Sequence, residues 1–136
     1  MERLACLLAQ KPAVLLLGPE TGHMAIIHAL NKDYGIEPLV YSESRPGFVP
    51  GLLRYCFRRI KHPDNEYYII RTLLDFNSDS ESRQTVLLVP CTPYYEEMIK
   101  RHTGLLEPYF IIKSAEELIE ALPTLTRKAK KKVKTC

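Results

Sequence analysis

The chain has 136 residues, which suffices for one domain with a sizeable core but not for two. With 46% hydrophobic and 26% charged residues, its composition excludes a chain that is disordered throughout. The net charge of +3 arises at the C-terminus: six basic residues lie in 127–136 with no acidic residue, so residues 1–126 carry −3. The folded body is therefore mildly acidic, and the basic character belongs to a tail.

The four cysteines lie far apart in the sequence, at Cys6, Cys56, Cys91 and Cys136. None forms a CxxC pair, and none has a histidine at metal-ligand spacing, so free thiols in a reducing compartment are expected. The first twelve residues predict a short amphipathic helix, too short to span a bilayer and too weakly apolar for a secretion signal. We therefore expect a cytoplasmic protein without a membrane partner.

The first half of the chain predicts a strand–helix–strand unit. The apolar run Ala13–Leu17 is typical of a strand buried on both faces, and the turn GPETG follows it. Thr21 is expected to cap a helix from Gly22 to Tyr34, which Gly35 ends. A second strand is predicted at Pro38–Tyr41. The predicted buried stripe of the helix consists of Ala25, Ile26, Ala29 and Leu30.

The second half repeats this alternation. Strands are predicted at Phe57–Lys61, Thr85–Val89 and Tyr109–Ile112, and helices at Leu52–Tyr55, Glu66–Phe76, Pro93–His102 and from Ser114 to a stop at Pro123. Strands that alternate with helices favour a three-layer, Rossmann-like α/β fold with an open parallel sheet. We expect about five strands in the order 3-2-1-4-5. Ligands then favour the switch point between strands one and four, where loops begin at Gly18 and Pro90.

The loop after the first strand is the first candidate for chemistry. GPETG is neither GxGxxG nor a Walker loop, although backbone amides at the start of the following helix could receive an anion. A tight turn that only feeds the helix is the alternative interpretation. His23 and His28 are five residues apart, which is not the spacing of paired metal ligands on a helix.

Cys91 directly follows the fourth strand and precedes a helix, where a thiol can become a nucleophile. The alternative is that it packs as a small hydrophobic side chain. Arg58, Arg59 and Lys61 form a basic cluster that could meet phosphate or carboxylate groups, or could simply guard a strand edge.

The basic tail could bind nucleic acid through charge alone, but it has no aromatic residues of the kind that stack on bases. Nucleic acid is therefore not expected as a partner.

The predicted organisation is one domain over 1–123 and a basic, disordered tail over 124–136.

Several motifs in the same order resemble one known family. The opening AVLLLGPETGHMAIIHALNKDYGIEPLVYSES, the stretch from Arg54-Tyr55 to His62-Pro63-Asp64, and TVLLVPCTPYYEEMIKRHTGLLEPYFII resemble the N-terminal pre-ATP-grasp domain of ATP-grasp carboxylate–amine ligases. The nearest branch is the D-aspartate ligase-like group, and the resemblance covers Ala13 to Leu122. The chain departs from the family at Thr92-Pro93-Tyr94, where an aspartate is usual, and at Pro19-Glu20 in the first loop.

The resemblance implies a substrate-side domain that is not catalytic alone, because ATP and magnesium are held by the domains that follow it in the family. No cofactor is expected in this chain. The implied partners are an ATP-grasp catalytic domain or chain and an amino-acid or carboxylate ligand; a homodimer is expected if apolar surface is left uncovered. Residues expected to bind substrate or an anion are Gly18, Glu20, Thr21, Gly22, Ser42, Arg45, Cys91, Thr92 and Tyr94; no catalytic residue or metal ligand is expected.

Three alternatives remain open at this point. The chain could be a stand-alone Rossmann-like regulatory domain that binds a nucleotide or a small anion. It could bind nucleic acid through its tail, or it could be a thiol enzyme built on Cys91.

Overall fold

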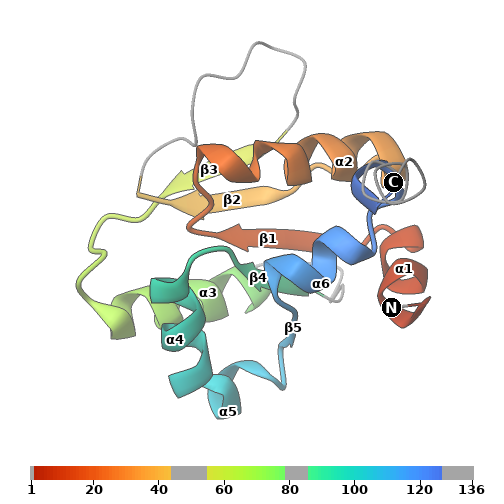
Figure 1. The fold of residues 1–136 in the computed structure, drawn as a ribbon. Helices are drawn as coiled ribbons and strands as arrows, with labels where there is room; N and C mark the ends of the chain where they lie inside the picture. Colours follow the sequence, from red (N-terminus) through yellow and green to blue (C-terminus); the bar gives the residue numbers. More distant parts are fainter. Residues whose placement is uncertain (1, 44–54, 79–85, 127–136) are drawn as a thin grey trace.

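A five-stranded parallel sheet forms the centre of the computed structural model, which describes residues 2–43, 55–78 and 86–126 (Figure 1). The strands are β1 (Ala13–Leu17), β2 (Leu39–Ser42), β3 (Cys56–Arg59), β4 (Val86–Pro90) and β5 (Phe110–Ile112). Their order is β3-β2-β1-β4-β5, and every neighbouring pair is parallel. The predicted α/β fold and its strand order are confirmed.

The central strand β1 explains why the sheet needs cover on both sides. Val14 to Leu17 are each at most 2% exposed, and β4 is buried along its whole length. Successive side chains of a strand point to opposite faces, so a continuous apolar run buries area on both. Helices must therefore pack on each face of the sheet.

Two helical layers provide this cover, and each has its own apolar cluster. Leu8, Leu30 and Leu118 represent the first cluster, and Ile69, Met98 and Leu106 represent the second. Figure 1 shows α2 above the sheet and α3 and α4 below it. The first layer contains α1 (Glu2–Ala9), α2 (Met24–Tyr34) and α6 (Ala115–Glu120), and the second contains α3 (Glu66–Ser78), α4 (Pro93–Arg101) and α5 (Thr103–Leu106).

The start of α2 differs from the prediction. A 3₁₀ turn, η1 (Thr21–His23), precedes the helix, which begins at Met24 with His23 at the N-cap position. Thr21 is therefore not the cap, because the turn inserts two residues between it and the helix. Ala25 is exposed, and Ile27 faces the core in its place, which buries the larger apolar side chain. The predicted end is confirmed, since Gly35 adopts a left-handed conformation with φ 67°.

Three further helix predictions differ from the structure or cannot be compared with it. Of the helix predicted at Leu52–Tyr55, only Tyr55 lies within the described residues, and it is not helical. The short helix α5 was not predicted. Pro123 was expected to stop a helix, but α6 already ends at Glu120 and Pro123 opens a further helical turn over 123–126. A proline fits the first turn of a helix because it has no N–H to leave unpaired.

The C-terminal part of the described chain is tied to α2. The Thr124 amide donates to a carboxylate oxygen of Asp33 at 3.0 Å, and Tyr34 donates its hydroxyl proton to the Ala121 carbonyl at 2.8 Å. Leu125 also packs against the first apolar cluster. Packing thus continues to Leu125, past the predicted domain boundary at 123. Residues 127–136 of the predicted tail lie outside the described residues.

Two residues of the basic cluster, Arg58 and Arg59, lie on the edge strand β3, and Lys61 follows it. Arg58 and Arg59 are exposed, and the Arg58 guanidinium lies 4.7 Å from the centre of the Phe76 ring. Charged side chains on an edge strand oppose the addition of another strand. This placement favours the edge-guarding interpretation of the cluster.

The beginning of α6 provides a test of the local structure. Ser114 and Glu117 form a capping box, in which the Ser114 hydroxyl accepts from the Glu117 amide at 3.1 Å and the Glu117 carboxylate accepts from the Ser114 amide at 3.2 Å. We expect Ser114→Ala to lower the free energy of unfolding by about 1 kcal/mol, because a helix amide loses its partner. Urea denaturation measures this, with Ser114→Asp as a control that keeps an acceptor. Equal losses in the two variants would contradict the capping role.

Candidate functional site

Three loops meet at the carboxyl edge of the sheet and enclose a crevice. The Gly18 amide donates to the Tyr41 carbonyl at 2.8 Å, and the Cys91 amide donates to the Leu17 carbonyl at 2.9 Å, so β1, β2 and β4 end at the same level. The hollow beside these ends has a volume of about 380 Å³. Its lining comprises Gly18, Glu20, Ser42, Glu43, Thr92, Pro93, Tyr94 and Tyr95. It lies at the switch point between β1 and β4, where the sequence predicted a ligand site.

Position 18 requires glycine because the Tyr95 ring packs directly against it. Gly18 has a φ of 67°, and a Cβ atom placed on it would lie 2.2 Å from a carbon of the Tyr95 ring. A side chain there would both strain the backbone and overlap the ring. The ring therefore occupies the space beside the first turn, and that space is closed to a ligand.

The Tyr95 hydroxyl connects this turn to the end of β2. It donates a hydrogen bond to Oε1 of Glu43 at 3.1 Å, and the residue is 5% exposed. Burial, together with the neighbouring Glu43 carboxylate, raises the pKa of Tyr95 well above its ordinary value. The phenol thus stays protonated and holds the Glu43 carboxylate at the wall of the crevice.

The backbone amides of the first loop are partly used within the loop itself. The Glu20 amide donates to Nδ1 of His23 at 2.8 Å, and the His23 amide donates to the Glu20 carbonyl at 2.9 Å. Glu20 lines the crevice, whereas Gly22 is exposed and not part of the lining. Thr21 is described only through its backbone. These two amides are therefore already engaged and are not available to a phosphate group.

Three further residues of the lining carry hydroxyl groups. Ser42, at the end of β2, is 7% exposed, and Thr92 is the N-cap residue of α4 without a side-chain cap hydrogen bond. Tyr94 is half exposed and donates its hydroxyl proton to the Pro63 carbonyl at 2.8 Å. This contact fixes the Tyr94 side chain between α4 and the loop that follows β3.

Cys91 lies apart from the crevice lining. Its thiol is buried in the first apolar cluster and donates to the Val89 carbonyl at 3.6 Å. Burial, with a smaller contribution from Glu96, raises the pKa of this thiol from 9.0 to about 12. This environment favours the interpretation of Cys91 as a small hydrophobic residue over that of a nucleophile. Arg45, the remaining predicted site residue, lies outside the described residues.

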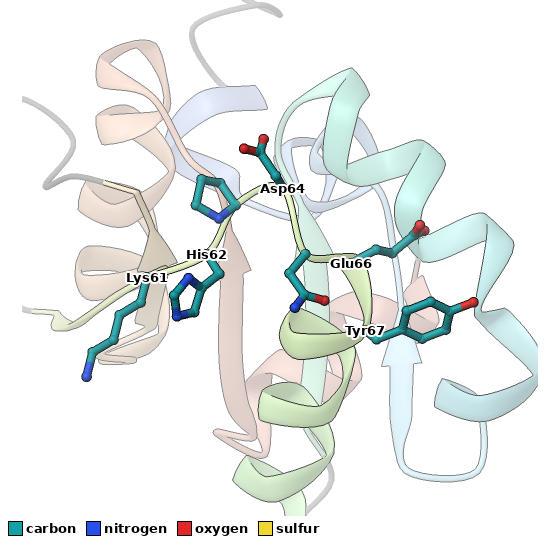
Figure 2. A pocket seen from close by; sticks show the side chains of 7 residues that line it. Lys61, His62, Asp64, Glu66 and Tyr67 are labelled. Carbon is teal, nitrogen blue, oxygen red and sulfur yellow. The ribbon is translucent and has the colours of Figure 1, made fainter.

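A second hollow, of about 620 Å³, lies beside the loop between β3 and α3 (Figure 2). Its lining is Lys61, His62, Pro63, Asp64, Asn65, Glu66 and Tyr67. Figure 2 shows Glu66 directed toward α4 and Lys61 directed away on the other side of the loop. Nε of Arg101 lies 2.8 Å and Nε2 of His102 lies 3.0 Å from Oε1 of Glu66. The hydrogen bond from Arg101 lowers the pKa of Glu66, so this carboxylate is occupied in joining α3 to α4.

The structure places five of the predicted site residues around the crevice. The sequence analysis missed two of their neighbours. Gly18, Glu20, Ser42, Thr92 and Tyr94 all line the crevice. Glu43 and Tyr95 were not predicted. A carboxylate at the end of β2 and the second tyrosine of TPYYEE were visible in the sequence, but their contact joins residues 52 positions apart.

Searches of protein-family models, curated proteins and solved structures find no match to this chain. Within residues 2–43, 55–78 and 86–126, no group of three or more His, Cys, Asp or Glu side chains is placed to hold a metal ion. In the same ranges, no helix has the length and apolar character needed to cross a bilayer.

The contact between Gly18 and Tyr95 can be tested by a double-mutant cycle. We expect Gly18→Ala to lower the free energy of unfolding by more than about 2 kcal/mol, from backbone strain and ring overlap together. In a Tyr95→Ala background the same change should cost only the strain, about 1–2 kcal/mol. Gly22→Ala is the matched control, because a Cβ there meets no atom within 4 Å. Equal costs of Gly18→Ala in both backgrounds would contradict the proposed contact.

The burial of Cys91 predicts slow alkylation. At pH 8.5 we expect iodoacetamide to label Cys91 at least about a hundredfold more slowly in the folded protein than in urea, because the folded thiol stays protonated. The exposed Cys6 and Cys56 serve as internal controls in peptide mass spectrometry. The raised pKa also means that the free energy of unfolding falls as pH rises from 9 toward 12, where only the unfolded thiol ionises. Native labelling of Cys91 as fast as that of Cys56 would overturn this assignment.

Proposed function

We propose that this domain is the substrate-side module of an ATP-grasp carboxylate–amine ligase and that it works with a separate catalytic domain or chain. The observation that carries the proposal is the crevice at the switch point, lined by hydroxyls, carboxylates and phenols. A lining of this kind can orient a small polar molecule by hydrogen bonds. The resemblance of the sequence to pre-ATP-grasp domains supplies the reaction class.

The crevice is poorly suited to the nucleotide of such a reaction. The Tyr95 ring fills the space next to Gly18, and Glu20 stands two residues later, where the dinucleotide fingerprint needs a second glycine for the pyrophosphate. The carboxylates of Glu20 and Glu43 would repel a polyphosphate. These features support a division of labour in which ATP binds to the catalytic partner.

The proposal assigns binding rather than bond-making to this chain. Phosphoryl transfer depends on positioning and on cations that neutralise the developing charge. The described lining of the crevice contains carboxylates and hydroxyls but no Lys, Arg or His side chain. The buried Cys91 thiol, with its raised pKa, does not offer an alternative nucleophile.

A stand-alone nucleotide-binding regulator is the second candidate, and one observation favours it. Glu43 directly follows β2, where dinucleotide-binding domains place the carboxylate that holds a ribose hydroxyl. Its Oε1 already accepts a hydrogen bond from Tyr95, but a carboxylate can accept several more. The two candidates therefore differ in what the crevice receives, a nucleotide or a smaller polar substrate.

Isothermal titration calorimetry of the purified chain separates the candidates. Titration with magnesium–ATP is expected to give no heat of binding, and titration with a panel of amino acids is expected to give a weak, saturable signal. Ser42→Ala should weaken that signal several-fold because one polar contact is lost, while the exposed Glu97→Gln should leave it unchanged. Micromolar affinity for magnesium–ATP would overturn the substrate-side proposal in favour of the regulator.

A further inference from the structure

Ser42 is a buried residue of the crevice lining whose hydroxyl, unlike that of Tyr95, has no partner in the described chain. Its backbone is paired, since the Ser42 carbonyl accepts from the Ile60 amide at 2.7 Å. The residue is 7% exposed and lines the crevice, yet its hydroxyl has no hydrogen-bond partner within the described ranges of the chain. Buried polar side chains in folded proteins nearly always have a partner. An unpaired hydroxyl in a hollow at the ligand edge of the sheet therefore points to a ligand that completes it.

The charge of the crevice indicates what kind of ligand fits. Glu20 and Glu43 are its charged residues, and no Lys, Arg or His side chain is part of the lining that the structure describes. The Glu43 carboxylate receives one hydrogen bond, from the Tyr95 hydroxyl, which orients it and leaves further acceptor positions. Such a lining attracts positive charge and repels carboxylate or phosphate groups. The anion that the sequence analysis expected near the first loop therefore fits this part of the site poorly.

An aromatic wall strengthens the preference for a cation. The Tyr94 ring is half exposed, lies 5.0 Å from the Tyr95 ring at an angle of 83°, and is anchored through its hydroxyl to Pro63. A positive charge near an electron-rich ring is stabilised by the ring quadrupole. A metal ion is a poor candidate, because no group of three or more ligating side chains forms in the described part of the chain.

We propose that the crevice binds a protonated primary or secondary amine, with its N–H groups shared between the Glu43 carboxylate and the Ser42 hydroxyl. Glu20 adds negative charge at the mouth, and Tyr94 forms the side wall. The N–H groups distinguish this ligand from a quaternary ammonium ion, which could satisfy the charge but could not donate to Ser42. This inference rests on the proposed function and names the chemical class of the substrate.

A matched series of five-carbon probes tests the inference. Amide chemical shifts of Gly18, Ser42 and Thr92 are followed by NMR while 1,5-diaminopentane, 1,5-pentanediol or glutarate is added to the full chain. The diamine is expected to produce saturable shifts at these amides, and the diol and glutarate are expected to produce none. Tetramethylammonium should bind more weakly than methylammonium, because it lacks N–H donors.

Variants connect the binding to the named side chains. Glu43→Gln keeps an acceptor for Tyr95 but removes the charge, and it should weaken diamine binding by about tenfold. Ser42→Ala should weaken it several-fold, and Glu20→Gln offers a second charge-removing variant if Glu43→Gln fails to fold. The control is Glu97→Gln, an exposed residue of α4 paired with Lys100 that does not line the crevice; thermal unfolding verifies that each variant is folded.

The outcomes separate this inference from the proposed function. Saturable shifts with glutarate or the diol but not the diamine would overturn the amine inference and leave a substrate-binding crevice in place. The absence of diamine shifts overturns the inference in every case, whereas the proposed function fails only if magnesium–ATP binds or the amino-acid panel gives no signal. Diamine binding that Glu43→Gln and Glu97→Gln weaken equally would mean general attraction to an acidic surface and would also overturn the inference.

Discussion

The burial of β1 on both faces is the constraint on which the rest of the structure depends. A strand whose residues from Val14 to Leu17 are nearly free of solvent contact must have strands on either side and helices above and below. Parallel neighbours then need crossovers, and the crossovers return each following strand to run in the same direction. The ends of β1, β2 and β4 meet at one edge as a result, and the loops that leave them have to share a small volume.

Within that volume, one chain of contacts decides what the crevice can accept. Tyr95 rests against Gly18, and its hydroxyl holds the carboxylate of Glu43. The ring removes the space that a pyrophosphate would use, and the carboxylate sets the sign of the charge at the wall. Ser42 lies at the end of β2, next to Glu43, and its hydroxyl has no partner in the described structure. These few side chains are the basis of our proposal that this edge receives a ligand that is smaller and more basic than a nucleotide.

The fold was predictable because its signals are local. Apolar runs such as Ala13–Leu17 and the serine-to-glutamate spacing at Ser114 specify a buried strand and a helix start without reference to the rest of the chain. The position of the switch point followed from the order of elements, so Ser42 and Thr92 could be placed beside Gly18. The pairing of Tyr95 with Glu43 could not be predicted, because it depends on how α4 is rotated against β2. Thr21 was misplaced for a similar reason, since nothing in GPETGH distinguishes a helix cap from a 3₁₀ turn.

The two edge strands determine how readily the sheet can pair with another strand. A parallel sheet that ends in open edges offers unpaired backbone groups to any other strand, including that of a second copy. Here one edge is β5, which is only three residues long, and the other is β3, where Arg58 and Arg59 are exposed. Two copies that approached through β3 would bring like charges near one another, and two that approached through β5 would gain few hydrogen bonds. Both edges of the described sheet are thereby poorly suited to edge-to-edge pairing.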